Sequence, residues 1–569
     1  MAPAVVVAAA GDVGRAFASE AMRELLPVRG IASLTSGGPA AGLRGHQAQA
    51  DSAGTPSATP AFLSGFALAA GASSAAAVSA LLRRSRRPRR CRAQPLPIVS
   101  RAGLLDGFMG GGGSVVEVPS YLAAPPEWEE LAKRLDELTP TEEQEGIEAT
   151  LAGRGRLRAD MSKTRLFEAT DESKVRVHLY RDSASWCPYC EKVQLALEEK
   201  QVPYKISKIN MNCYGDKPFD FLAKNPMGLL PVAEFDGRMV TDSNSILDEI
   251  EARFPDKKRL VPPGQEAEVA QLLRLERELF GAWFSWLRSP GSDARNRMAF
   301  IEVLEEVERR LGVHADGPFF LGAEVSMPEC HFASFLERMA ASLAYFKGFQ
   351  MRQNLKFPNL EAWFKALEAR DSYKGLAGDF YTHAHDLPPQ VGGCAFNGEH
   401  KDYQEAIDGA SWRLPLPVDE SATPLEPLLL NTAAESEAAR REAARKLISN
   451  RKGVVPFCLR GAGRGGFPQV SAPLSDPRAS PSGDAQVKAA VDEALRGVAS
   501  HLLQGGGAAI LPEAVGPSAF ARHEDVEVCL KYFQDRVGVP RDMSFPAARQ
   551  LRAHIGSYLE ATIAVSTSA

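Results

Sequence analysis

Two cysteines three positions apart have the clearest capacity for chemistry, in the segment WCPYC at residues 186–190. The thiolate is the reactive form of cysteine, and a helix N-terminus stabilises it because free backbone N–H groups and the helix dipole favour negative charge. Cys187 stands between an alternating segment at 176–180 and a helical pattern at 189–200. Pro188 suits the first helical position, where its missing N–H costs no hydrogen bond. The pattern predicts a nucleophilic thiol at Cys187.

Cys190 follows one helical turn later and is either a second, resolving thiol or a plain buried residue. The alternatives for the pair as a whole are a metal knuckle and two inert core cysteines. Zinc is disfavoured because the sequence has no second CxxC and no nearby pair of histidines to complete four ligands. His383 and His385 are close together but are expected in an exposed loop. The sequence also contains no GxSxG, HExxH, P-loop or dinucleotide fingerprint, so we expect thiol chemistry and no metal.

The elements around these cysteines are predicted from hydrophobic periodicity. Strands are expected at 175–180, 204–209, 230–235 and 238–240, and helices at 189–200, 219–224 and 242–254. The β-α-β start implies parallel strands, and the hairpin signal Asp236-Gly237 adds an antiparallel edge. A helix is expected before this unit at 127–151, and only helices after it, at 266–288, 296–312, 328–346 and 359–370.

This order and the WCPYC segment resemble a cysteine-type glutathione S-transferase, and are similar to the omega, lambda and dehydroascorbate-reductase classes. The resemblance is closer still to a plant and algal plastid family that shares WCPYC at 186–190, YGDK at 214–217 and a long C-terminal extension. The likeness covers about 172–382. It implies an α/β thioredoxin-like domain at 172–257 that binds glutathione and an all-α transferase domain at 263–382.

The resemblance also implies how glutathione is held. The cysteinyl backbone of the tripeptide would pair with Leu230, next to a cis bond at Pro231. Asp242 and Ser243 resemble the family's acid-serine pair for the γ-glutamyl end, although the same residues would also form an ordinary N-cap. Lys217 would take the glycyl carboxylate, an assignment that rests on the resemblance alone.

An acceptor pocket is expected between the two domains. Trp283 and Trp286 on the first long helix and Tyr345 on a later one are the weakest of the site predictions, because aromatic residues at helical spacing are more often core. Ser326 and Glu329 form a capping-box pattern at the start of a buried helix, with a role in folding.

Charge separates the first 120 residues from the rest. They hold twelve Arg, no Lys and six acids, within a chain whose formal net charge is −5. An uncharged stretch at 61–82 precedes an Arg cluster, and a Gly-rich joint follows at 110–114. Such a leader resembles a plastid transit segment; a retained membrane anchor and a disordered tail are the alternatives. We therefore predict a disordered targeting leader and flexible linker at 1–120, which would make transient membrane contact, and a helical lead-in at 121–171.

Residues 383–569 are predicted to be a mostly helical extension with linkers at Pro388-Pro389 and 461–483. Either it covers the transferase core or it is a docking module for a partner. Composition gives no sign of a nucleic-acid binder, and eight scattered cysteines favour a reducing compartment. Plastid location is predicted, with a cytoplasmic or membrane-anchored protein as the alternative, and a homodimer is left open.

The predicted function is that of a glutathione-dependent thiol transferase or reductase. Cys187 would form a mixed disulfide with glutathione, the co-substrate, while reducing dehydroascorbate or a small or protein-bound disulfide. The alternatives are a dithiol, glutaredoxin-like disulfide reductase, in which Cys190 resolves the intermediate, and a non-catalytic binding module with the transferase fold.

Overall fold

The computed structural model describes residues 118–169, 171–291, 293–417, 425–427, 433–470, 472–505 and 507–568. They belong to one compact unit. The predicted leader, apart from its last three residues, lies outside these ranges. Among the described residues, no helix combines the length and apolar character needed to span a bilayer.

A five-stranded sheet carries the cysteine motif, in the order β1-β3-β2-β4-β5. The strands are β1 (Thr164–Arg165), β2 (Val177–Asp182), β3 (Tyr204–Ile209), β4 (Val232–Phe235) and β5 (Arg238–Thr241). β2 and β3 are parallel, and β4 and β5 form the antiparallel edge, as the sequence predicts. β1 is missing from the prediction because two residues are too short to show alternation; it pairs antiparallel with β3.

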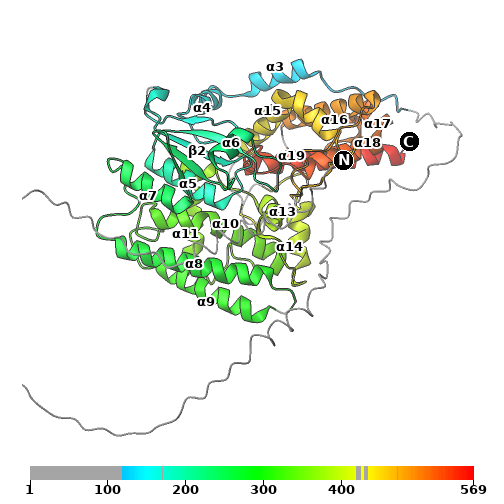
Figure 1. The fold of residues 1–569 in the computed structure, drawn as a ribbon. Helices are drawn as coiled ribbons and strands as arrows, with labels where there is room; N and C mark the ends of the chain where they lie inside the picture. Colours follow the sequence, from blue (N-terminus) through cyan, green and yellow to red (C-terminus); the bar gives the residue numbers. More distant parts are fainter. Residues whose placement is uncertain are drawn as a thin grey trace, which may run out of the picture. The chain divides into compact units, whose positions relative to one another are not determined.

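Helices follow the strands in the expected order (Figure 1). Within the sheet domain they are α5 (Pro188–Lys200), α6 (Phe219–Lys224) and α7 (Ser243–Arg253), with the short turn η1 (Glu172–Lys174) before β2. The helical domain contains α8 (Glu266–Arg288), α9 (Ala294–Leu311), α10 (Met327–Lys347), α11 (Pro358–Glu368), α12 (Asp371–Lys374) and α13 (Phe380–Val391). The predicted and observed ranges agree to within two residues for α8 to α11.

Helix α10 is buried along its whole length, so its first turn needs partners inside the protein. The capping box supplies them: Glu329 accepts hydrogen bonds from the Ser326 backbone N–H at 2.8 Å and the Ser326 hydroxyl at 2.6 Å. Its second oxygen accepts the Phe320 N–H at 2.8 Å. The capping box predicted from sequence is confirmed.

The predicted single helix at 127–151 is wrong, because two helices occupy this range. α3 (Trp128–Leu138) and α4 (Thr141–Leu151) are separated by Thr139 and Pro140, both in extended conformation. A residue before proline is pushed out of the helical region by the proline ring, and this breaks the helix. Leu131, Leu135 and Leu138 have helical spacing up to the break, and the polar residues after it continue without a change of pattern, so periodicity does not reveal it.

α13 also differs from the sequence interpretation, because it runs through the predicted boundary at residue 382. Pro388 and Pro389 lie inside this helix rather than in a linker. His383 and His385 are 2% and 7% exposed on it, so the expected exposed loop is wrong. Burial of apolar side chains along α13, from Phe380 to Val391, offsets the free energy lost because the two prolines cannot donate helical hydrogen bonds.

The extension builds a second hydrophobic core. After α14 (Lys401–Glu405) and the π-turn η2 (Ala406–Ala410) come α15 (Ala433–Cys458), α16 (Ala485–Gln504), η4 (Pro512–Ala514), α17 (Pro517–Ala521), α18 (His523–Gln534) and α19 (Phe545–Ser568). Trp128, Leu131 and Leu135 of α3 are buried in this same core. Figure 1 shows α3 (cyan) beside α15 and α16 (yellow to orange). The lead-in is therefore packed on the extension although about 300 residues separate them in the chain.

Candidate functional site

Cys187 lies where the chain leaves β2 and enters α5. It is the N-cap of that helix, with extended backbone angles, and Pro188 occupies the first turn. The backbone N–H of Glu191 donates to the Cys187 carbonyl at 3.1 Å, the first hydrogen bond of the helix. The Cys187 side chain is 4% exposed. This is the position that the sequence predicts for a thiolate stabilised by free N–H groups.

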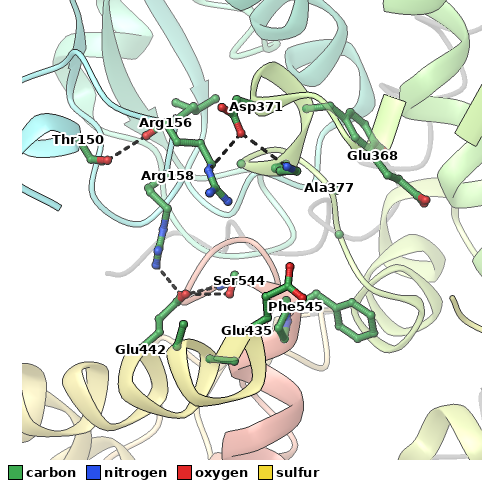
Figure 2. Close-up of a pocket in the computed structure, with 18 of the residues that line it drawn as sticks. Thr150, Arg156, Arg158, Glu368, Asp371, Ala377, Glu435, Glu442, Ser544 and Phe545 are labelled. Atoms are coloured by element: carbon green, nitrogen blue, oxygen red, sulfur yellow. Dashed lines mark hydrogen bonds and ion pairs between the residues drawn. The ribbon is translucent and has the colours of Figure 1, made fainter. Parts of the chain in front are cut away.

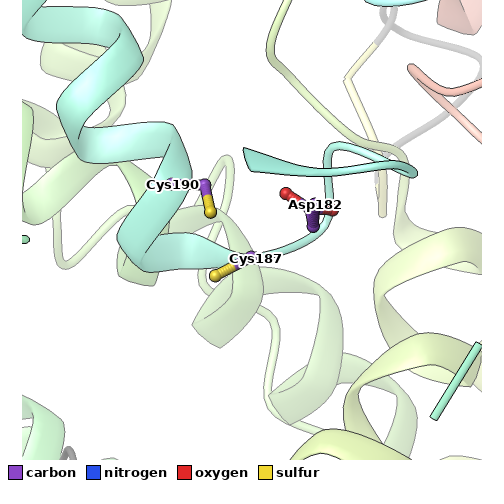
Figure 3. A group of neighbouring side chains, drawn as sticks. All are labelled: Asp182, Cys187 and Cys190. Carbon is purple, nitrogen blue, oxygen red and sulfur yellow. The ribbon is translucent and has the colours of Figure 1, made fainter. Parts of the chain in front are cut away.

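The turn before Cys187 is held by a buried carboxylate. Asp182 ends β2, is fully buried, and accepts the Trp186 N–H at 2.7 Å and an N–H of Arg181 at 3.1 Å. Figure 3 shows Asp182 beside Cys187 and Cys190, whose ligand atoms all lie within 4.8 Å of one another. Their spacing would admit a metal ion. The Asp182 carboxylate already has the Arg181 guanidinium at one oxygen and the Trp186 N–H at the other.

Cys190 is completely buried beside Cys187. Burial, followed by its hydrogen bond with Cys187 and the charge there, raises the pKa of the Cys190 thiol well above its ordinary value. Cys190 therefore stays protonated at neutral pH. Both thiols are free.

The segment predicted to pair with the tripeptide backbone lies next to the Cys187 sulfur. The Leu230–Pro231 bond is cis, as predicted. The Cys187 Sγ lies 4.0 Å from the Leu230 carbonyl oxygen. The Lys217 side chain packs against Gly228, two residues before Leu230. A β-carbon placed on Gly228 would lie only 3.3 Å from it. The Lys217 Nζ donates to the Asn210 carbonyl at 2.5 Å, and burial lowers its pKa.

Asp242 and Ser243 begin α7. The exposed Asp242 carboxylate accepts the backbone N–H groups of Asn244 at 3.1 Å and Ser245 at 3.0 Å, so it is an N-cap. Ser243 is fully buried. The Nζ of Lys192 on α5 donates to the Asn244 side chain at 2.8 Å and thereby links the starts of the two helices.

The predicted acceptor pocket is wrong for all three aromatic residues. Trp283 and Trp286 are fully buried, and their indole N–H groups donate to Ser342 at 3.0 Å and Asp293 at 2.7 Å. Tyr345 is 6% exposed and donates to Asp408 at 2.8 Å. Each polar ring atom has an internal partner, as in a packed core.

The extension covers one side of the cysteine turn. The Trp186 indole N–H donates to the Val539 carbonyl at 3.0 Å, and the Arg541 guanidinium lies 4.8 Å from the centre of the Trp186 ring. The Ser475 hydroxyl donates to the Tyr214 carbonyl at 3.1 Å. Trp186 is consequently fully buried.

A cavity of about 650 Å³ lies away from Cys187, where the lead-in, the helical domain and the extension meet (Figure 2). Ion pairs line it: Arg156 with Asp371 at 3.4 Å, and Arg158 with Glu442 at 2.5 Å. Glu442 also accepts the Ser544 hydroxyl at 2.8 Å. The polar contacts around this cavity therefore join distant parts of the chain. No residue of the cysteine motif lines it.

Arg338 is the polar neighbour of the cysteine turn that sequence reasoning missed. It projects from α10, is 1% exposed, and donates to the Trp186 carbonyl at 2.9 Å. A signal was present: Glu337 and Arg338 are the only Asp, Glu, Lys or Arg residues between Glu329 and Lys347 of an otherwise apolar helix. Charges at such positions are buried only when they are paired.

A thiol at the end of a thioredoxin-like strand, followed by a helical domain, defines a glutathione-transferase-like class. Residues 186–253 match the model of the glutathione S-transferase N-terminal domain, and residues 268–375 match that of the C-terminal domain. The chain is 30% identical over 188 residues to the glutathione S-transferase DHAR2 of Arabidopsis thaliana, an alignment that covers 33% of this chain and 82% of the relative. It is 27% identical over 187 residues to the chloroplastic DHAR3 of the same plant, covering 33% of this chain and 67% of the relative.

Among solved structures, the dehydroascorbate reductase of Chlamydomonas reinhardtii is similar at 24% identity and a TM-score of 0.30, over 36% of this chain and 93% of that one. The chain belongs to the glutathione S-transferase family, a family of enzymes. This confirms the family and the fold class expected from the sequence.

Proposed function

We propose that this protein is a glutathione-dependent thiol transferase in which Cys187 is the nucleophile. One observation carries the proposal: the Cys187 sulfur lies at the start of α5 and 4.0 Å from the Leu230 carbonyl, beside the cis bond at Pro231. A helix N-terminus favours the thiolate, and the extended segment offers main-chain groups to a peptide.

The reaction has two exchange steps. The Cys187 thiolate attacks the glutathione sulfur of a glutathionylated acceptor, forms the Cys187–glutathione disulfide and releases the acceptor as a thiolate. A second glutathione, as thiolate, then attacks that disulfide, leaving oxidised glutathione and the Cys187 thiolate. For a glutathionylated acceptor, one sulfur of the oxidised glutathione comes from the acceptor's mixed disulfide and the other from the incoming glutathione. Dehydroascorbate carries no glutathione, so its two-electron reduction to ascorbate consumes two glutathione molecules, which leave as oxidised glutathione.

Monothiol chemistry is favoured by the state of Cys190. Its raised pKa keeps it protonated, and a protonated thiol is a poor nucleophile for a resolving step. Dithiol chemistry is the second candidate, supported by the short separation of the two sulfur atoms, which is within 4.8 Å.

A small acceptor is favoured by burial of the thiol. Cys187 is 4% exposed and Leu230 is 7% exposed, so a bulky protein disulfide would require more side chains to move than a small oxidant. Dehydroascorbate, the small oxidant expected from the sequence, is the acceptor we propose to test first.

Glutathione would contact residues on two sides of the thiol. Leu230 and Pro231 would bind the cysteinyl backbone, and Lys217 would bind the glycyl carboxylate after exchanging its bond to Asn210. Ser243 and the N–H groups that begin α7 would receive the γ-glutamyl carboxylate, and the exposed Asp242 its ammonium group.

We also propose a plastid location, by a leader within residues 1–120, which the chloroplastic DHAR3 relative supports. The proposed division of the mature chain is a glutathione-binding domain at 172–257, a helical domain at 263–382 and an extension from 383, with the lead-in at 121–171 packed on the extension.

The test combines activity with mass spectrometry. Purified protein is incubated with oxidised glutathione, and the capped thiol is identified by peptide mapping; capping at Cys187 is expected. Cys190→Ser should retain reduction of dehydroascorbate if glutathione resolves the intermediate, and loss of that activity would favour the dithiol mechanism. Cys213→Ser, at another buried thiol, is the matched control.

A further inference from the structure

Arg338 is bonded to the chain on both sides of Cys187. Its guanidinium donates to the carbonyl of Trp186, the preceding residue, at 2.9 Å. It also donates to the Glu191 carboxyl group, one turn later on α5, at 2.8 Å. Two further bonds stay on its own helix, one to Glu337 at 2.7 Å and one to the Ser334 carbonyl. Rigid, planar donors in a fork are suited to joining several acceptors in fixed geometry.

The guanidinium is also a buried charge close to the thiol. Arg338 is 1% exposed, and the charge on Cys187 is one of the groups that raise the pKa of the guanidinium. Burial, followed by the charge on Glu337, raises the pKa of Glu191 well above its ordinary value. For Glu337, the charges of His383 and Arg338 outweigh burial and hold the pKa at about 2. At neutral pH the guanidinium therefore faces an ionised Glu337 carboxylate.

We propose that Arg338 is a positioning residue for the reaction: from the helical domain it fixes the Trp186–Cys187 turn and stabilises the Cys187 anion. This inference rests on the proposed function for its catalytic meaning. Helix α10 of the helical domain thus places a cation near a thiol of the sheet domain.

Other charges near the thiol remain in place when Arg338 is changed. Arg181 and Asp182 come from β2 and Lys217 from the loop after β3, and the titratable Cys190 lies one turn further along α5. From the extension, Arg541 lies over the Trp186 ring. A change in the pH dependence of the thiol on replacing Arg338 therefore reports the loss of this one cation and of its four bonds.

The test is the rate of Cys187 alkylation by iodoacetamide against pH, followed by peptide mass spectrometry. Arg338→Met should move the midpoint of this profile upward by about one pH unit, because an opposite charge nearby typically shifts a titration by about one to three units. At pH values below the midpoint, the rate of alkylation should then fall about tenfold. Arg338→Lys, which keeps the charge without the fork, should give an intermediate profile.

Arg352→Met is the matched control. Arg352 is 4% exposed in the same domain and is bonded to two carboxylates, Glu361 and Glu368. The Arg352→Met variant should lower the midpoint temperature of unfolding, as Arg338→Met does, but should leave the alkylation profile of Cys187 unchanged. Equal profiles for the two Met variants would overturn the proposal.

A fourth variant keeps the proposal testable if Arg338→Met does not fold. Arg338→Gln keeps an N–H donor on the side chain but removes the charge, and should move the midpoint upward; a downward or absent shift contradicts the proposal. The readout needs no glutathione. Shifts of the predicted sign without transferase activity in the wild type would contradict the proposed function alone, and activity without shifts would contradict this inference alone.

Discussion

Two pairs of buried cysteines in this protein have opposite surroundings. Cys187 and Cys190 are at the N-terminal end of α5. Cys458 is the last residue of α15, and Cys529 lies within α18, both in the core of the extension. All four side chains are at most 4% exposed, so burial does not distinguish the pairs.

The surrounding charges distinguish Cys187 from the two cysteines of the extension. Burial raises the pKa of Cys458 well above its ordinary value, and the charge on Cys529 adds to this. Burial raises the pKa of Cys529 to about 11. The C-terminal end of a helix is its negative end and disfavours a thiolate at Cys458. Cys187, by contrast, has the positive end of a helix, Arg338 and Lys217 nearby. Charge arrangement rather than exposure is expected to decide which buried thiol reacts.

The largest expected effect comes from removing the sulfur at Cys187. Cys187→Ser should reduce thiol-transferase activity to the uncatalysed background, because a hydroxyl cannot form the mixed disulfide. Cys458→Ser is the control in the other pair and should retain activity. The measurement is glutathione-dependent reduction of dehydroascorbate and of a small mixed disulfide. Full activity in Cys187→Ser would contradict the mechanism.

Alkylation should separate the two pairs within one sample. With a pKa of about 11, only about one Cys529 thiol in ten thousand is ionised at pH 7. Iodoacetamide should therefore modify Cys187 while Cys458 and Cys529 remain unmodified until urea unfolds the extension. Peptide mass spectrometry over time gives the order. Modification of Cys529 before Cys187 in folded protein would reverse the comparison.

The extension should lose stability in mild acid through His554. This fully buried side chain bonds the Gln550 carbonyl at 2.7 Å, and burial lowers its pKa to about 3. Below pH 6.5 the unfolded chain takes up a proton that the folded chain does not, so stability falls as pH falls toward 3. At pH 5 the loss attributable to His554 is about 2 kcal/mol.

The measurement for His554 is urea unfolding at pH 7.5 and pH 5. His554→Leu should lessen the pH dependence, whereas His523→Leu, at a partly exposed site on α18, should leave it as in the wild type. An unchanged dependence in His554→Leu would show that the titration lies elsewhere.

The smallest effect is expected where the extension meets the loop before Lys217. Arg478 pairs with Asp216 at 3.0 Å, but Asp216 is 88% exposed. Arg478→Ala should change the free energy of unfolding by less than about 1 kcal/mol, since exposed ion pairs contribute little. The KM for glutathione should rise about twofold at most. Ser475→Ala is a companion variant at a neighbouring contact, and a large rise in KM for either would make the extension part of the glutathione site.

Local patterns were sufficient for the elements around the thiol. The strand β3 is predicted residue for residue, and the Pro188 start of α5 and the Ser326–Glu329 capping box follow from the chemistry of helix N-termini. Each depends on neighbours within a few residues. The break at Pro140 and the helix through Pro388 show the limit, because there packing and local preference compete.

The sequence alone determined the family, the order of strands and helices, and the identity of the nucleophile expected at Cys187, because these depend on short-range periodicity and on a motif. Only the tertiary structure decided that Arg338, about 150 residues further along the chain, bonds the same turn, that Trp283 and Trp286 are core, and that α3 packs on the extension. Such contacts follow from which buried surfaces meet and which buried charges find partners, and spacing along the chain does not encode either.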